Sequence, residues 1–182
     1  MRYDVFVIGS GPAGQKAAIQ AAKAGRKVAV CEQLREIGGA CVHQGTIPSK
    51  ALRERAVEHA KALARLANMN LAPPLASISV AELIGEMGEV VSAHDRYMTE
   101  QLTRNGIDVI HGRASFASDK LVNVRRVNGN VEQFSCDHVV IASGSKPRIL
   151  DHVPVDHESI YDSDSILSLA YLPQSMVVLG GG

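Results

Sequence analysis

A single cysteine, Cys41, stands in a glycine-rich stretch whose residue types suit redox chemistry. The stretch reads GGACVHQGTIPSKAL and begins at Gly38. A thiolate is a nucleophile, and a pair of thiols can cycle through a disulfide. A hydroxyl side chain, Thr46, follows five positions later. From these residues alone, Cys41 is half of a broken redox pair, a nucleophile that works alone, or a small residue in a tight loop.

A second glycine-rich stretch, GSGPAG, has the spacing of a dinucleotide-binding turn. It fits G-x-G-x-x-G, and the residues it predicts to bind a nucleotide are Gly9, Gly11, Pro12, Ala13 and Gly14. A helix that begins at such a turn presents free N–H groups to a pyrophosphate. A glycine turn that merely joins a strand to a helix is the alternative, but the flanking pattern of strand, helix and acid-ended strand favours a nucleotide site.

The acid of this unit is Glu32, which ends the second predicted strand. An acid at this place can hydrogen-bond a ribose 2′-hydroxyl and repels a 2′-phosphate, so the site is expected to hold FAD or NAD rather than NADP. A solvated acid at the end of a strand is the plainer interpretation of Glu32.

The elements that must position these residues alternate between strands and helices. Apolar runs without a period predict buried parallel strands, and Asn128-Gly129 predicts a hairpin turn. Predicted strands span 3–8, 27–31, 107–110, 138–142 and 176–179. Short β segments of a meander are predicted at 114–116, 121–127 and 131–135. Helices are predicted at 12–24, at 46–67 with Thr46 as a candidate N-cap, and at 80–104. The two long helices are expected to pair antiparallel, and residues 33–45 are expected to form a loop. The predicted fold is α/β and Rossmann-like, with a mostly parallel sheet and a small antiparallel β-meander.

The bulk composition excludes several classes of protein. Lys plus Arg and Asp plus Glu both number 19, so no basic excess points to nucleic acid or an anionic membrane. The three cysteines are too few for a secreted disulfide scaffold, and no apolar run suits a membrane helix or signal peptide. A cytoplasmic protein with reduced thiols and no metal site is expected. The final SMVVLGGG has the pattern of an apolar strand followed by three glycines, which predicts that the chain is the front part of a longer protein.

The loop around Cys41 resembles that of the flavin disulfide reductases, whose motif has the form G-G-x-C-x-x-x-x-C-x-P-S-K. The matching residues are Gly38, Gly39, Cys41, Pro48, Ser49 and Lys50, whereas Thr46 replaces the second cysteine. With His43 and the run GTIPSKALR, the loop is similar to one branch of this family, the soluble pyridine nucleotide transhydrogenases. The segment YDSDSIL at 161–167 also resembles that branch.

The resemblance implies a flavoprotein oxidoreductase, with a FAD-binding domain at 1–174 followed at 175–182 by the first strand and glycine turn of a truncated NAD(P)-binding domain. Its cofactor would be FAD, and in the full-length protein NADPH would reduce FAD and NAD⁺ would take the hydride. Nicotinamide nucleotides would be its partners, and the full-length protein would be a homo-oligomer, while the isolated chain would be inactive. Because Thr46 excludes an intramolecular disulfide with Cys41, and neither Cys31 nor Cys136 is placed to substitute, electrons must leave to another acceptor. A dihydrolipoyl dehydrogenase-like enzyme and a non-catalytic FAD-binding fragment are the alternatives.

The resemblance also assigns residues around the flavin. Cys41 would line the isoalloxazine, act as a nucleophile, or serve as an oxidisable thiol. Thr46 would cap a helix or hydrogen-bond the flavin. Lys50 would stabilise charge on the reduced ring or be a solvated helix lysine. The family motif A-T-G-x-x-P is matched from Ala142, with Ser143 in place of the threonine. The segment from His111 would contact adenine, with His111 itself structural. The expected cofactor-binding residues beyond the first turn are Glu32, Gln33, Gly38, Gly39, Ala40, Cys41, Thr46, Lys50, Gly112, Ala114, Ala142, Ser143, Gly144 and Ser145.

Overall fold

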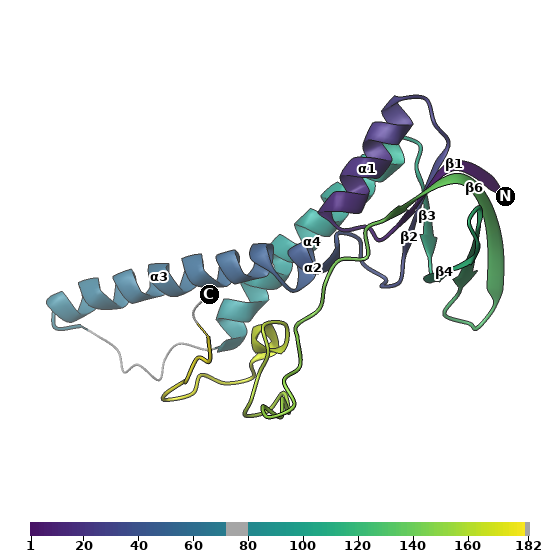
Figure 1. The fold of residues 1–182 in the computed structure, drawn as a ribbon. Helices are drawn as coiled ribbons and strands as arrows, with labels where there is room; N and C mark the ends of the chain where they lie inside the picture. The colour runs from purple at the N-terminus through teal and green to yellow at the C-terminus, as the bar shows by residue number, and fades with distance from the viewer. Residues whose placement is uncertain (72–79, 181–182) are drawn as a thin grey trace.

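The structure is a computed structural model that describes residues 1–71 and 80–180, without the side chains of 80–84 and 86. Its helices and strands follow the predicted alternation (Figure 1). In chain order they are β1 Arg2–Ile8, α1 Pro12–Lys23, β2 Val28–Glu32, α2 Gly39–His43, α3 Thr46–Asn68, α4 Val80–Arg104, β3 Asp108–His111, β4 Arg113–Ser118, β5 Leu121–Arg125, β6 Val131–Ile141 and the 3-10 helix η2 Ser165–Ser168. In this part of the chain, no helix combines the length and apolarity that crossing a membrane requires.

The strands form one six-stranded sheet in the order β3-β2-β1-β6-β5-β4. β1 pairs in parallel with β2 and β6, and β2 pairs in parallel with β3. β4, β5 and β6 pair antiparallel and form the expected meander. The predicted α/β fold with a mostly parallel sheet is confirmed. Because parallel strands end at the same edge, the loops after β1, β2, β3 and β6 meet there.

The strand β6 joins the two parts of the sheet. Two separate runs, 131–135 and 138–142, were expected, but the structure has one continuous strand of 11 residues. Ser135 is paired both with Leu121 of β5 and with Arg2 of β1, so the strand passes from the meander into the parallel sheet without a break. The extended conformation continues through the intervening residues because each half of β6 has a neighbour for its backbone hydrogen bonds.

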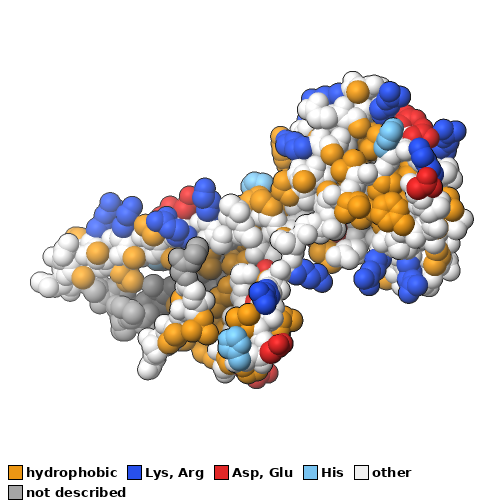
Figure 2. Space-filling view, in the orientation of Figure 1, with side chains coloured by type: hydrophobic (Ala, Val, Ile, Leu, Met, Phe, Trp, Pro, Cys, Tyr) orange, Lys and Arg blue, Asp and Glu red, His pale blue; other side chains and the backbone are white. Residues whose placement is uncertain are grey.

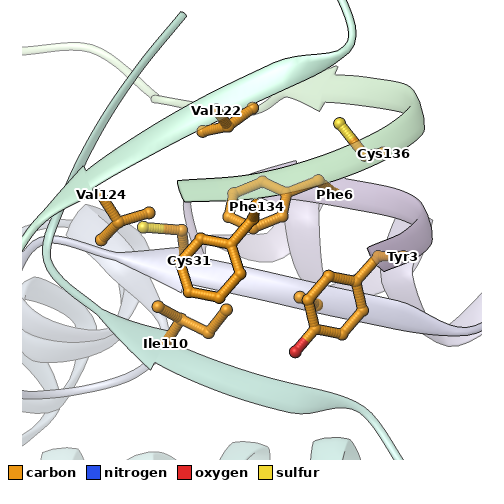
Figure 3. Packing of buried hydrophobic residues seen from close by; sticks show 9 residues of the cluster. Tyr3, Phe6, Cys31, Ile110, Val122, Val124, Phe134 and Cys136 are labelled. Atoms are coloured by element: carbon orange, nitrogen blue, oxygen red, sulfur yellow. The ribbon is translucent and has the colours of Figure 1, made fainter. Parts of the chain in front are cut away.

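Two hydrophobic clusters cover the two faces of the parallel strands. Phe6 of β1 points into the cluster under the meander, and its neighbour Val7 points into the cluster under α1 and α4. This alternation is the ordinary period of a strand. In the first cluster, the rings of Phe6 and Phe134 lie 5.7 Å apart between centroids, with Tyr3 beside them (Figure 3). The meander therefore packs over one face of the sheet while α1 and α4 cover the other.

The loop expected at 33–45 contains a short helix, α2. Val42 on α2 is fully buried, and the Gln44 N–H donates to the Ala40 carbonyl. Burial of the Val42 side chain stabilises a helical turn in this segment, which its glycine-rich composition alone does not predict. The predicted cap at Thr46 is wrong, because Gly45 occupies the N-cap of α3 and no side chain caps it.

The long helices pair less completely than expected. α3 contacts α4, but its far end projects beyond the rest of the fold (Figure 1). Along α4, Leu102 is buried and Met98 packs against the core, whereas Val90 is exposed. The sequence predicts that Pro73-Pro74 ends the first long helix, but these two residues lie outside the described part of the chain, as does the Leu83 side chain.

The strand predicted at 176–179 is absent from the structure. These four residues have no regular structure, and Val177 is 86% exposed. An apolar run becomes a strand only when a neighbour pairs with its backbone, and no strand in the described part of the chain does so. The predicted domain boundary before Ser175 stays a prediction.

The aromatic contact between the sheet and the meander is expected to contribute strongly to stability. Phe134 is 4% exposed, whereas Phe116 of β4 is 50% exposed. We expect Phe134→Ala to lower the free energy of unfolding by about 3–5 kcal/mol, because it removes a buried ring and leaves a cavity. Urea unfolding measures this, with Phe116→Ala as the matched control. Equal losses in the two variants would contradict the packing described.

Candidate functional site

A cleft of about 580 Å³ opens where the parallel strands end. Its wall is formed by the loops that follow β1, β2, β3 and β6, together with α2. Fifteen of the sequence-predicted residues lie on this wall: Gly9, Gly11, Pro12, Ala13, Glu32, Gln33, Gly39, Ala40, Cys41, Gly112, Ala114, Ala142, Ser143, Gly144 and Ser145. Segments far apart in the chain are therefore brought to one site by the order of the strands.

The first glycine turn is packed too tightly for side chains at two of its positions. Gly9 has φ +104°, and a Cβ there would overlap the Ala142 carbonyl. A Cβ on Gly14 would overlap the Gly9 carbonyl. Gly14 thus lies behind the cleft wall and lets α1 approach β1, as the third glycine of this motif is known to do.

The N-terminus of α1 is open toward the cleft. Gly11 is its N-cap, Pro12 begins the helix, and no side chain caps the first turn or places an acid in it. A Cβ on Gly11 would meet only the Gly38 carbonyl, at 4.0 Å. Free N–H groups, the positive end of the helix dipole and an unobstructed backbone fit a pyrophosphate.

Glu32 is held at the end of β2 by a buried network. Its Oε2 accepts hydrogen bonds from the Ser10 backbone N–H at 2.9 Å and from the Ser10 hydroxyl at 2.6 Å, and its Oε1 accepts one from the Leu34 N–H at 3.0 Å. Burial raises the pKa of this carboxyl, but the hydrogen bonds from Ser10, Leu34 and Gln33 outweigh burial and lower the pKa below its ordinary value. Glu32 is therefore an ionised acceptor on the cleft wall at neutral pH.

The second glycine-rich loop is anchored to the first by the same serine. The Gly38 N–H donates to the Ser10 hydroxyl at 3.1 Å, and the Ile37 N–H donates to Asp95 Oδ1 of α4 at 2.7 Å. The His43 Nε2 lies 2.8 Å from the Ile37 carbonyl, so this nitrogen donates a proton and does not act as a base toward Cys41. These bonds fix α2, which places Ala40 and Cys41 on the cleft wall.

Four predicted residues are not on the cleft wall. Gly14 and Gly38 pack behind it, and Thr46 and Lys50 are exposed on the first turns of α3. Contact of Thr46 or Lys50 with a flavin stays a prediction. His111 has the structural role expected of it, because its Nδ1 lies 3.0 Å from the Leu34 carbonyl.

Sequence reasoning missed several residues of the site. Ser10 matters most, because it occupies an unspecified position of G-x-G-x-x-G and is fully buried. The missed residues that lie on the wall itself are Ile8, Cys31, Leu34, Gln44, Arg113 and Lys146. Ile8, Cys31, Leu34, Arg113 and Lys146 adjoin a predicted residue in the chain, so widening each motif by one position would have found them. Gln44 could be assigned to the cleft wall only once the helical turn of α2 was known.

The three cysteines are free and differ in their surroundings. The buried Cys31 thiol donates to the Gly112 carbonyl at 3.2 Å. Burial, then the charge of Glu32, raises the pKa of Cys31 to about 11, and burial also raises the pKa of Cys136. Both therefore remain thiols at neutral pH, and only Cys41 is partly exposed at the cleft.

The residues present fit a dinucleotide that carries a ribose and a pyrophosphate. The uncapped helix N-terminus suits the phosphates, Glu32 suits a ribose hydroxyl, and the small residues from Ala142 to Ser145 leave backbone open to a flat ring.

No cluster of metal-ligating side chains occurs within the residues that the structure describes. On the face shown in Figure 2, Lys and Arg side chains are scattered rather than gathered into one patch.

Comparison with known proteins agrees with this geometry. The profile of the pyridine nucleotide-disulphide oxidoreductase family matches residues 3–182. The chain is similar to proteins named soluble pyridine nucleotide transhydrogenase. It is 40% identical to that of Pseudomonas putida and 41% identical to that of Pseudomonas fluorescens strain Pf-5, over 99% of this chain. It spans 39% of the length of each relative.

Solved structures with the same fold include a flavoprotein disulfide reductase and LpdA. The HOCl-induced flavoprotein disulfide reductase RclA from Escherichia coli, in a Cu(II) complex, superposes with a TM-score of 0.79 at 27% identity, over 95% of this chain and 36% of RclA. LpdA from Mycobacterium tuberculosis gives a TM-score of 0.79 at 26% identity, over 95% of this chain and 38% of LpdA.

The tight packing behind the first turn predicts a position-specific effect of alanine. Gly14→Ala is expected to lower the free energy of unfolding by about 1–3 kcal/mol, because the added Cβ forces α1 away from the Gly9 carbonyl. Gly88→Ala in α4 is the control, because a Cβ there meets nothing within 4 Å. Alanine at that helical position should be neutral or stabilising by up to about 1 kcal/mol. Thermal or urea unfolding that ranks the two variants the other way would contradict this packing.

The different burial of the cysteines predicts their order of reaction with a thiol reagent. In the native protein Cys41 should react first with Ellman's reagent, and Cys31 and Cys136 should react only after unfolding, because both are buried and protonated. Cys41→Ser should abolish the early phase and leave the late phase intact. An early phase that survives this substitution would show that a buried thiol is accessible.

Proposed function

Because the chain belongs to the pyridine nucleotide-disulphide oxidoreductase family, we propose that it forms the FAD-binding part of an enzyme that transfers hydride from NADPH through FAD to NAD⁺. The net reaction would convert NADPH and NAD⁺ to NADP⁺ and NADH. The transhydrogenase relatives support this activity. It is proposed for the full-length protein, since the chain spans 39% of those relatives.

The cleft residues would share the binding of FAD according to their chemistry. The N-terminus of α1 would bind the pyrophosphate, and Glu32 would accept a hydrogen bond from the adenosine ribose. The backbone around Gly112 would lie by the adenine, and α2 with the Ala142–Ser145 turn would flank the flavin. Bound FAD would supply the hydride chemistry, while these residues orient it.

The observation that carries this proposal over disulfide reduction is the lack of a second usable thiol beside Cys41. Thr46 stands where the second cysteine of the motif would be. Cys31 also borders the cleft, but its thiol is buried, bound to the Gly112 carbonyl and protonated at neutral pH. A disulfide that could accept two electrons does not form readily from these groups. The hydride would therefore pass to a second nicotinamide nucleotide.

Further features of the full-length protein remain part of the proposal. Residues 175–182 would begin the NAD(P)-binding domain, and the protein would be a cytoplasmic homo-oligomer. A disulfide reductase is the second candidate, and it is favoured by the flavoprotein disulfide reductase RclA among the structural neighbours. The two candidates differ in whether turnover needs the Cys41 thiol.

The proposal predicts hydride exchange that does not depend on a thiol. Full-length protein loaded with FAD should reduce thio-NAD⁺ at the expense of NADPH, followed by the absorbance of the reduced thio-nucleotide. Cys41→Ser should keep this rate within about threefold of wild type, because Cys41 would line the site without transferring electrons. The isolated 182-residue chain is a control that should show no turnover.

The competing function has its own signature in the same experiment. Reduction of lipoamide or glutathione disulfide by the full-length protein, lost in Cys41→Ser, would overturn the proposal in favour of disulfide reduction. An absence of flavin absorbance after reconstitution of the full-length protein would overturn the flavin site itself.

A further inference from the structure

The side chain of Ser10 is the junction of three loops that border the cleft. It lies between the first glycine turn, the end of β2 and the second glycine-rich loop, and it is 0% exposed. Its hydroxyl oxygen is 2.6 Å from Glu32 Oε2 and 3.1 Å from the Gly38 nitrogen. Ser10 is not on the cleft wall, so it can influence a ligand only through the groups that it holds.

The directions of these hydrogen bonds follow from the groups involved. The Gly38 N–H can only donate, so the serine oxygen accepts from it. The Glu32 carboxylate is ionised and can only accept, so the serine proton is directed to Oε2. The single hydroxyl proton of Ser10 is thereby committed to Glu32. No other hydroxyl rotamer satisfies both partners.

This arrangement restricts the Glu32 carboxylate. Oε2 accepts from both the N–H and the hydroxyl of Ser10, and Oε1 accepts from the Leu34 N–H. Together with the Gln33 backbone, these groups fix the orientation of the carboxylate. Each carboxylate oxygen can accept more than one hydrogen bond, and Glu32 borders the cleft, so it can accept a further bond from a donor there. A ribose hydroxyl is such a donor.

We propose that Ser10 is a positioning residue for recognition of the adenosine ribose. Its hydroxyl holds Glu32 in the orientation that accepts a hydrogen bond from the 2′-hydroxyl, and it ties that acid to the Gly38 loop that leads to Cys41. The inference rests on the proposed FAD site. It adds that ribose selectivity is set by the second residue of G-x-G-x-x-G, a position that the motif leaves open.

Removal of the hydroxyl should affect selectivity more than the fold. In Ser10→Ala, Oε2 keeps the backbone N–H of residue 10 but loses its shortest hydrogen bond, and the Gly38 N–H loses its acceptor. The carboxylate can then rotate away from the ribose. A ligand that lacks the 2′-hydroxyl makes no such hydrogen bond to Glu32, so its affinity should fall less in this variant.

The test compares FAD with the FAD analogue built on 2′-deoxyadenosine. Both are titrated into full-length apoprotein, and binding is followed by flavin fluorescence, which reports on the flavin site alone. We expect wild type to prefer FAD by about tenfold, a ratio that one hydrogen bond to a charged group can supply. Ser10→Ala should reduce this preference to about twofold or less. Ser118→Ala, an exposed serine of β4, is the matched control and should keep the wild-type preference.

Two further variants separate positioning from a general structural role. In a Glu32→Gln background, Ser10→Ala should change the preference no further, because Ser10 acts through that carboxylate. Ser10→Cys preserves the side-chain size with a weaker donor, so it replaces Ser10→Ala if the alanine variant does not fold.

The outcomes divide clearly. Loss of the preference in Ser10→Ala or Ser10→Cys, with no added loss in the Glu32→Gln background, supports the inference. Equal weakening of both ligands with the preference retained overturns it and leaves the flavin site standing. Failure of wild-type protein to bind either ligand overturns the proposed function, and the inference with it.

Discussion

The buried carboxylate of Glu32 and the hydroxyl of Ser10 form the interaction on which the cleft depends. A charged group with so little solvent contact is stable only when hydrogen bonds replace its hydration. The structure supplies them from the turn after β1 and from the chain just after β2. Through the Gly38 N–H, the same serine fixes the start of the second loop. Because these bonds connect three segments, the shape of the cleft is a property of the network rather than of any one loop.

The sheet provides the rigid frame for this network. Its parallel strands are packed on both faces, by α1 and α4 on one and by the meander on the other. β6 belongs to both the parallel sheet and the meander, and its last residue, Ile141, pairs with Ile8 at the end of β1. The Ala142 carbonyl then lies against Gly9, which leaves no room for a side chain there. Packing far from the cleft thus determines how closely its loops approach each other.

The redox interpretation depends on the same frame. α2 places Cys41 at the cleft, while β2 places the Cys31 thiol against the Gly112 carbonyl, in surroundings that keep it protonated. The two thiols are therefore held in chemically different places. Substitution of the second motif cysteine by Thr46 removes the partner that a disulfide would need. Under the proposed function, these residues would orient a flavin without relaying electrons through sulfur.

The sequence alone determined the features that are local in the chain. The glycine turn, the helix after it and Glu32 at the end of β2 follow from residues within one short βαβ unit, where spacing specifies geometry. The alternation of strands and helices and the single cysteine of the second glycine-rich loop could likewise be identified from the sequence. The resemblance to the flavin disulfide reductases also predicted most of the remaining cleft wall, and these residues lie together because the loops after parallel strands meet at one edge.

Tertiary structure decided the features that need a partner from elsewhere in the chain. Ser10 became important only when Gly38 was brought beside it, and α2 formed because Val42 found a place in the core. The two runs of β6 became one strand because different neighbours pair with its two halves. Conversely, residues 176–179 have the composition of a strand but lack a paired neighbour in the described chain. Propensity is a property of a segment, whereas hydrogen-bond pairing and burial are properties of two segments that meet.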